Sequence, residues 1–128
     1  MQYLLDTHVL IWWMTSDNRL STTAKDLIKS PRNNIYWSVA SSWEISIKYA
    51  LGKLEFDEPP ENLIPSELDK NHIETLTILN NHAFLAGQLP VHHKDPFDRM
   101  LVAQARIESL GVISDDSKFK FYDVDVYW

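Results

Sequence analysis

The stretch Tyr3-Leu4-Leu5-Asp6-Thr7-His8-Val9-Leu10-Ile11-Trp12-Trp13 decides the fold. Its first three residues are typical of a short buried strand, which ends on Asp6 and turns directly into an apolar helix. In an open α/β sheet, ligands bind beyond the carboxyl ends of the strands, where the following helices begin. Asp6 therefore occupies a position at which such proteins do chemistry. The simpler alternative is that Asp6 or Thr7 only caps the helix that starts near His8.

Strand and helix patterns alternate along the whole chain. Further strands are expected at 35–37, 75–78, 112–113 and 124–128, the last of them at a sheet edge. Helices are expected after Ser21, over 39–51 and 81–86, from Asp95 to Gly111, and near 63–68, where Pro65 would kink or split the helix. This alternation predicts a single α/β domain over residues 1–128, with a mainly parallel sheet of about five strands and helices on both faces.

Composition narrows the class of protein. A chain of 128 residues that is 45% hydrophobic can bury the core of one domain. The chain has no cysteine, so a disulfide framework and a thiolate metal site are excluded, and an intracellular, cytoplasmic location is favoured. The apolar N-terminus lacks a basic leader, which argues against a signal peptide or a membrane span. The net charge of -6 argues against a generally basic nucleic-acid-binding face, but it does not exclude a nucleic-acid enzyme whose acids hold cations.

A second acid, Glu44, lies in the second turn of the expected helix over 39–51. It falls at the edge of an apolar face made by Ala40, Trp43, Ile47 and Leu51. A carboxylate this close to the core costs free energy unless a partner neutralises it. Lys48, four residues further on, offers an ion pair as the purely structural explanation.

The segment Asp95-Pro96-Phe97-Asp98-Arg99 opens a long apolar helix. Asp95 is in the N-cap position, Pro96 is the first helical residue, and Asp98 is the third. Asp98 also has a purely structural explanation, since a carboxylate in the first turn of a helix complements the helix dipole. The next expected strand, 112–113, runs into Ser114-Asp115-Asp116, so an apolar strand again ends in acid.

Parallel topology sends these acids to one edge of the sheet, where strands end and helices begin. Four carboxylates at close range repel one another unless some are protonated or a cation is present. Oxygen ligands without cysteine suit Mg²⁺ or Mn²⁺, one ion or two. Such an ion activates water for in-line attack on phosphorus, so phosphodiester hydrolysis is the expected reaction.

Four motifs, taken together and in this order, resemble the PIN domain, and within it the VapC-type toxins of toxin-antitoxin pairs. They are Leu5-Asp6-Thr7-His8 with Trp12-Trp13, Ser-Val-Ala-Ser-Ser-Trp-Glu at 38–44, Asp-Pro-Phe-Asp-Arg at 95–99, and Ile-Ser-Asp-Asp-Ser-Lys-Phe at 113–119. The resemblance implies a PIN-like three-layer α/β/α sandwich and a metal-dependent endoribonuclease. It also implies a homodimer, an antitoxin that blocks the site, and operator DNA bound only through the antitoxin complex.

By matching motifs, Asp6, Glu44 and Asp98 take three catalytic, metal-binding positions. Asp116 fits the fourth by its distance from Phe119, with Asp115 as the alternative. His8 stands where the wider family often has Asn, which suggests a supporting role beside the site. Further residues that could support the site or hold substrate phosphate are Asp95, Arg99, Ser114, Lys48 and Lys53.

Other features carry weaker expectations. Trp12, Trp43 and Trp128 are expected in the core or at a dimer interface, although tryptophans also offer stacking surfaces for unpaired bases. The pair His92-His93 lacks a third spaced ligand, so a transition-metal site there is disfavoured.

Three alternative functions stay open from sequence. A PIN-type nuclease acting in RNA processing or on DNA would use the same residues. A phosphoacceptor signalling module shares the length and the acidic pocket, but it would need an acid pair after the first strand. A catalytically inert binding domain would not need the full acidic set.

Overall fold

The computed structural model describes residues 1–128 as a five-stranded, fully parallel sheet with strand order β3-β2-β1-β4-β5. The strands are β1 (Gln2–Leu5), β2 (Asn34–Ser38), β3 (Glu74–Leu76), β4 (Gly111–Ile113) and β5 (Val126–Tyr127). The predicted α/β class is confirmed, and every strand pair is parallel. All strands therefore direct their carboxyl ends to one edge.

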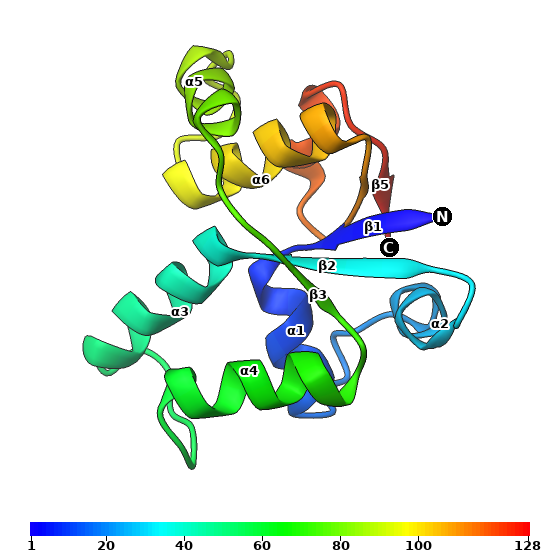
Figure 1. The fold of residues 1–128 in the computed structure, drawn as a ribbon, viewed down its shortest axis with the longest axis vertical. Helices are drawn as coiled ribbons and strands as arrows, with labels where there is room; N and C mark the ends of the chain where they lie inside the picture. The colour runs from blue at the N-terminus through cyan, green and yellow to red at the C-terminus, as the bar shows by residue number, and fades with distance from the viewer.

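Helices cover both faces of this sheet, as Figure 1 shows. They are α1 (Thr7–Met14), α2 (Thr22–Lys29), α3 (Val39–Ala50), α4 (Pro60–Lys70), α5 (Asn80–Gln88), α6 (Pro96–Glu108) and the short 3₁₀ helix η1 (Ser117–Phe121). In the view of Figure 1, α5 and α6 lie above the sheet, and α1 to α4 lie below it. None of these helices combines the length and the apolar character that crossing a bilayer requires.

Alternation along β1 divides the core into two layers. Tyr3 and Leu5 pack with α1, α2 and α4 on one face. Leu4 packs on the other face with Leu101 and Val102 of α6. β1 pairs with β2 and with β4, so it is flanked on both sides, and Leu5 lies opposite Ile113 in the register. The strand that carries Asp6 is thus the fixed centre of the molecule.

Local sequence explains most helix starts. Asp6, Ser21, Ser38 and Asp95 each occupy the N-cap position of a helix and accept a hydrogen bond from a backbone N–H of its first turn, as expected for these residue types. Gly52 follows α3 with a φ of 73°, the left-handed conformation that glycine adopts readily.

Several expected boundaries are wrong in detail. Pro65 does not split α4, which runs unbroken from Pro60 to Lys70; Pro65 is exposed, while Ile64 and Leu68 pack on the core. α5 continues through Gly87, and β3 covers 74–76 rather than 75–78. Ser109, rather than Gly111, ends α6 in the left-handed conformation, and the 3₁₀ helix η1 was not expected.

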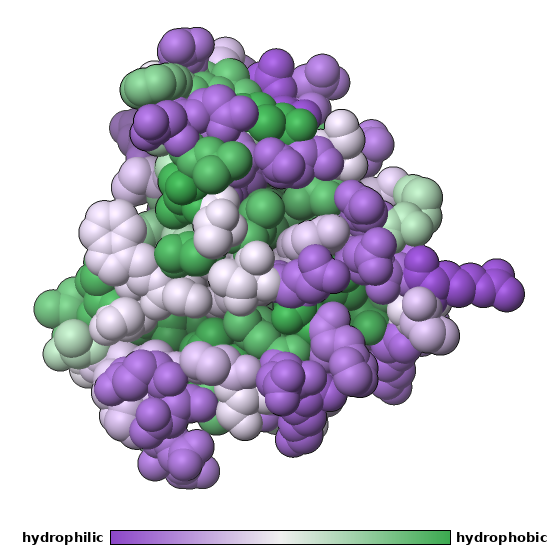
Figure 2. All heavy atoms as spheres, in the orientation of Figure 1, coloured by the Kyte–Doolittle hydropathy of each residue, from purple (hydrophilic) through white to green (hydrophobic).

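The prediction of which face of α3 packs on the core is wrong. The helix buries Ala40, Ser41, Glu44 and Ile45 instead. Trp43 is 64% exposed and Leu51 is 65% exposed, so this part of the helix faces outward. In Figure 2 apolar side chains reach the surface at the left edge, where the C-terminal half of α3 lies in Figure 1. Of the three tryptophans expected in the core or an interface, Trp43 is therefore not a core residue.

Gly111 is required by close packing at the start of β4. A Cβ atom there would lie 2.6 Å from Cε2 of Tyr127 and 3.1 Å from Cδ1 of Tyr3. We predict that Gly111→Ala lowers the free energy of unfolding by about 1–3 kcal/mol, as overpacking of a core does. Thermal unfolding followed by circular dichroism measures the change.

The matched control is Gly87→Ala, because the added Cβ inside α5 meets no atom within 4 Å. This variant should be stabilised by up to about 1 kcal/mol through helix propensity. Equal melting temperatures for the two variants would contradict the packing argument.

Candidate metal centre

Four carboxylates from separate elements converge at the carboxyl edge of the sheet. Asp6 ends β1, Glu44 lies in α3, Asp98 lies in the first turn of α6, and Asp116 follows β4. Burial raises the pKa of Asp98 to about 8, assisted by the negative charges of Asp6, Asp95, Glu44 and Asp116. The sequence-predicted acids are therefore brought close enough to repel one another.

Asp6 is held by groups that the fold places on both sides of it. Its side chain is buried, and its Oδ1 accepts a hydrogen bond of 2.7 Å from the backbone N–H of Thr7. The hydroxyl of Ser114 donates to Oδ2 at 2.7 Å. Burial raises the pKa of Asp6, although these donors and His8 act in the opposite direction. Asp6 therefore both caps α1 and presents a carboxylate at the strand end.

Glu44 is buried against the start of α1. The hydroxyl of Thr7 donates to Oε1 at 2.7 Å and also lies 2.8 Å from the hydroxyl of Ser41. Lys48 donates to Oε2 at 2.7 Å, the ion pair that the spacing suggested. Burial lowers the pKa of Lys48, but the bond and the charge of Glu44 outweigh it and raise the pKa overall. Among the four acids, Glu44 is thus the one that forms an ion pair with a lysine.

Asp98 does not close the cap of α6. Asp95 does so, since its Oδ1 accepts from the backbone N–H groups of Phe97 and Asp98 at 2.8 and 3.3 Å. The carboxylate of Asp98 is thereby free to face the other acids. It lies 2.9 Å from Nε2 of His93.

Asp116, rather than Asp115, lies among the converging acids. Its Oδ2 is 3.0 Å from Nε2 of His93, and its Oδ1 accepts from the backbone N–H of Lys118 at 2.9 Å. Burial raises the pKa of Asp116, but these donors and nearby positive charge lower it overall. Asp115 is exposed, and with His8 and Arg19 it lines a shallow hollow at the rim of the site.

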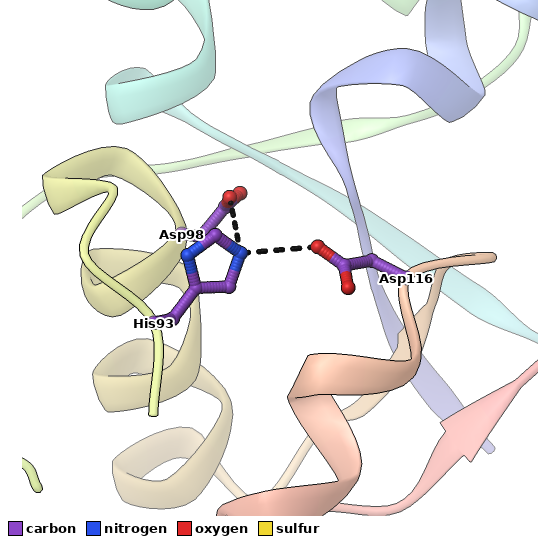
Figure 3. Close-up of side chains that lie close together, drawn as sticks. All are labelled: His93, Asp98 and Asp116. Atoms are coloured by element: carbon purple, nitrogen blue, oxygen red, sulfur yellow. Dashed lines mark hydrogen bonds and ion pairs between the residues drawn. The ribbon is translucent and has the colours of Figure 1, made fainter. Parts of the chain in front are cut away.

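His93 is the site residue that sequence reasoning set aside. His93, Asp98 and Asp116 each place one potential ligand atom within 4.8 Å of the others. Figure 3 shows the imidazole between the two carboxylates, reaching from the loop before α6. The missing partners of the His-His pair were thus acids that arrive from α6 and from the end of β4. The available signal was the position of His93 two residues before the N-cap of α6.

Arg99, one of the residues that could hold substrate phosphate, binds the protein backbone in the structure. The guanidinium of Arg99 donates to the backbone carbonyls of Ala86 and Leu89 at 2.8 Å, and to that of Pro90 at 3.2 Å. These bonds fix the loop before α6, so Arg99 is not aimed at an open substrate site. Lys53 is exposed and lies beyond the end of α3.

A separate surface hollow lies between α3 and α4. Its walls include Val39, Trp43, Pro60 and Ile64, and none of the four clustered acids lines it. This hollow is therefore separate from the cluster of four acids.

The donor set fits a hard divalent cation. Mg²⁺ and Mn²⁺ bind carboxylate oxygens, and the chain offers four such groups at one edge. Lys48 forms an ion pair with Glu44, but no lysine or arginine forms an ion pair with Asp6, Asp98 or Asp116. Asp6, Asp98 and Asp116, with Glu44 beside them, are the residues that would hold the ion.

A parallel α/β sheet that collects acids at its carboxyl edge can hold divalent metal ions, which is a site suited to phosphoryl transfer. The family is shown by a family model described as "PIN domain", which matches residues 3–125. The chain therefore belongs to the PIN domain family.

The individual proteins similar to this chain match it over a short segment or at low sequence identity. A segment of 56 residues is 36% identical to the protein named ribonuclease VapC16 of Mycobacterium tuberculosis, and it spans 44% of this chain and 40% of that protein. The chain also resembles a chain in the structure of VapBC2 from Rickettsia felis bound to a promoter DNA fragment, with a TM-score of 0.71 and 18% identity over 99% of this chain and 98% of that one. VapBC-1 from nontypeable Haemophilus influenzae contains a similar chain, with a TM-score of 0.67 and 20% identity over 99% and 97% of the two chains.

The raised pKa of Asp98 predicts that the stability of the metal-free protein depends on pH. Between the ordinary carboxyl pKa of 3.8 and about 8, the folded protein holds a proton on Asp98 that the unfolded chain releases. Stability from this group is therefore lost as pH rises through that window. Asp98→Asn removes this loss. Near pH 9 with EDTA, the free energy of unfolding of the variant should therefore exceed that of wild type by about 2–5 kcal/mol.

Melting temperatures measured across this pH range test the prediction. The exposed acid Asp115 supplies the control, because Asp115→Asn should follow the wild-type curve. Parallel curves for Asp98→Asn and wild type would show that Asp98 is not crowded by the other acids.

Proposed function

We propose that this chain is a metal-dependent endoribonuclease that acts as the toxin of a VapBC-type pair. The single observation that supports the proposal is the convergence of four acids at one edge, where burial and the negative charge of its neighbours raise the pKa of Asp98 to about 8. A site with so little compensating positive charge is costly for a structural role, but it suits a divalent cation. Mg²⁺ or Mn²⁺ is the proposed cofactor.

Each residue has a distinct task in this proposal. Asp6, Asp98 and Asp116 bind and orient the ion, while Glu44 completes the acidic ring and Thr7 and Lys48 orient its carboxylate. A bound divalent ion supplies Lewis acidity, lowers the pKa of water and stabilises the leaving oxygen. The protein contributes rigidity, because three of the four acids are attached to helix or strand ends that are fixed by backbone hydrogen bonds.

RNA is the proposed substrate on the basis of family membership and the partial match to a named ribonuclease. The net charge of -6 does not oppose this, because bound cations neutralise the surface where phosphate must approach. An enzyme of this kind would act in the cytoplasm. A nuclease for RNA processing or for DNA would use the same site.

The partners proposed for the chain are a cognate antitoxin, a second copy of the chain, and operator DNA reached through the antitoxin. Support comes from the similar structures, which are complexes named VapBC2 and VapBC-1, the former with promoter DNA. The outward apolar residues of α3 are available for protein contact. The signalling alternative is disfavoured, since receiver-like sheets have the order 2-1-3-4-5 and this sheet has β3-β2-β1-β4-β5.

Incubation of purified protein with total cellular RNA tests the activity. Wild type with Mg²⁺ or Mn²⁺ should release discrete fragments, and EDTA should prevent their release. Asp6→Asn and Asp98→Asn should slow cleavage by more than about a hundredfold, since losing an outer hydrogen-bond partner alone costs roughly 10–100-fold. Asp115→Asn is the matched control and should cleave like wild type.

Full activity in folded Asp6→Asn or Asp98→Asn would refute the assignment of the site. Cleavage of DNA but not RNA would replace the proposed substrate. Cleavage that persists undiminished in EDTA would refute metal dependence.

A further inference from the structure

We infer that His93 is a fixed N–H donor that holds the carboxylates of Asp98 and Asp116 together, as a positioning residue and not as a metal ligand. The inference rests on the proposed metal centre and deepens it. It concerns a side chain that the four-acid scheme leaves without a role.

The position of His93 is tightly fixed. The residue is 8% exposed, and its backbone N–H donates to the hydroxyl of Tyr122 at 2.9 Å. That hydroxyl in turn donates to the carbonyl of Pro90 at 2.8 Å. Arg99 reaches the carbonyl of His93 at 3.4 Å and binds the carbonyls that precede it along the loop. The loop therefore presents the imidazole in one place without support from the acids.

The hydrogen-bond pattern determines which ring nitrogen carries the proton. Nδ1 of His93 accepts from the backbone N–H of Asp95 at 3.3 Å, so this nitrogen carries no hydrogen. The proton is then on Nε2, which donates to Oδ2 of Asp116 at 3.0 Å and lies 2.9 Å from Oδ2 of Asp98 (Figure 3). A protonated Nε2 has no free electron pair, so in this orientation it faces the carboxylates as a donor.

The same arrangement occurs at the other two acids, where a neighbouring group donates to the carboxylate. Ser114 donates to Asp6, and Thr7 donates to Glu44. The only ion-pair contact of the Asp98 carboxylate is with Nε2 of His93, at 2.9 Å. Asp98 comes from α6 and Asp116 from the segment after β4, so the Nε2 group that is hydrogen-bonded to Asp116 and lies against Asp98 links two acids that no backbone connection brings together.

Mn²⁺ affinity provides the first test, measured at constant pH by counting free ion with electron paramagnetic resonance. His93→Phe keeps a planar ring without a donor and should weaken binding by at least about tenfold, as loss of an outer hydrogen-bond partner does. His93→Gln restores an N–H near the same position and should stay within about threefold of wild type. The adjacent His92 is exposed and packs on Phe121 and Tyr122, so His92→Phe is the matched control and should bind like wild type.

The second test uses the unmutated protein and so does not depend on variants that fold. In ¹⁵N NMR with diamagnetic Mg²⁺, Nε2 of His93 should remain protonated and Nδ1 unprotonated after the ion binds. Loss of the Nε2 proton on ion binding would make His93 a ligand and would overturn the inference. So would wild-type affinity in His93→Phe.

These results are separable from the proposed activity. If wild type binds Mn²⁺ and the variants follow the expected order while no RNA is cut, the substrate assignment fails and the role of His93 stands. If wild type binds no divalent ion, the metal centre and the role of His93 fail together.

Discussion

The structure depends on one unfavourable interaction, the repulsion among carboxylates that the parallel sheet collects at its carboxyl edge. Parallel strands end on the same side, and the helices that follow begin there, so acids at strand ends and in first turns must approach one another. The fold does not relieve this repulsion with an abundance of lysine or arginine. Burial and this repulsion together raise the pKa of Asp98 to about 8, so below that pH a proton occupies the site when no cation does.

Neutral donors hold the acids in place without cancelling their charge. The hydroxyls of Thr7 and Ser114 and the N–H of His93 orient carboxylates while keeping the site negative enough to attract a cation. Arg99 could have neutralised an acid but binds backbone carbonyls instead. The distribution of donors and cations in this chain is therefore consistent with a site built for an ion, because a purely structural cluster would be more stable with an internal ion pair for each acid.

Sequence reasoning predicted the parts of this arrangement that depend on chain direction and period. Asp6 after a strand and Asp95 at an N-cap follow from local rules, and the convergence of acids follows from parallel topology. The orientation of α3 did not follow, because hydrophobicity alone places Trp43 inward, whereas hydrogen bonds from Thr7 and Lys48 make it favourable to bury Glu44. His93 was also missed, because its partners come from α6 and from the segment after β4, and local spacing does not reveal such contacts.

The orientation of α3 connects the site to the protein surface. Successive residues of a helix are separated by about 100°, so turning Glu44 toward Thr7 rotates Trp43 out of the core. Trp43 then meets the ring of Phe97, the residue before Asp98, edge to face with centroids 5.3 Å apart. This aromatic contact joins α3 and α6, the helices that carry Glu44 and Asp98. The rotation of α3 that buries Glu44 is therefore the same rotation that places Trp43 against α6 at the surface.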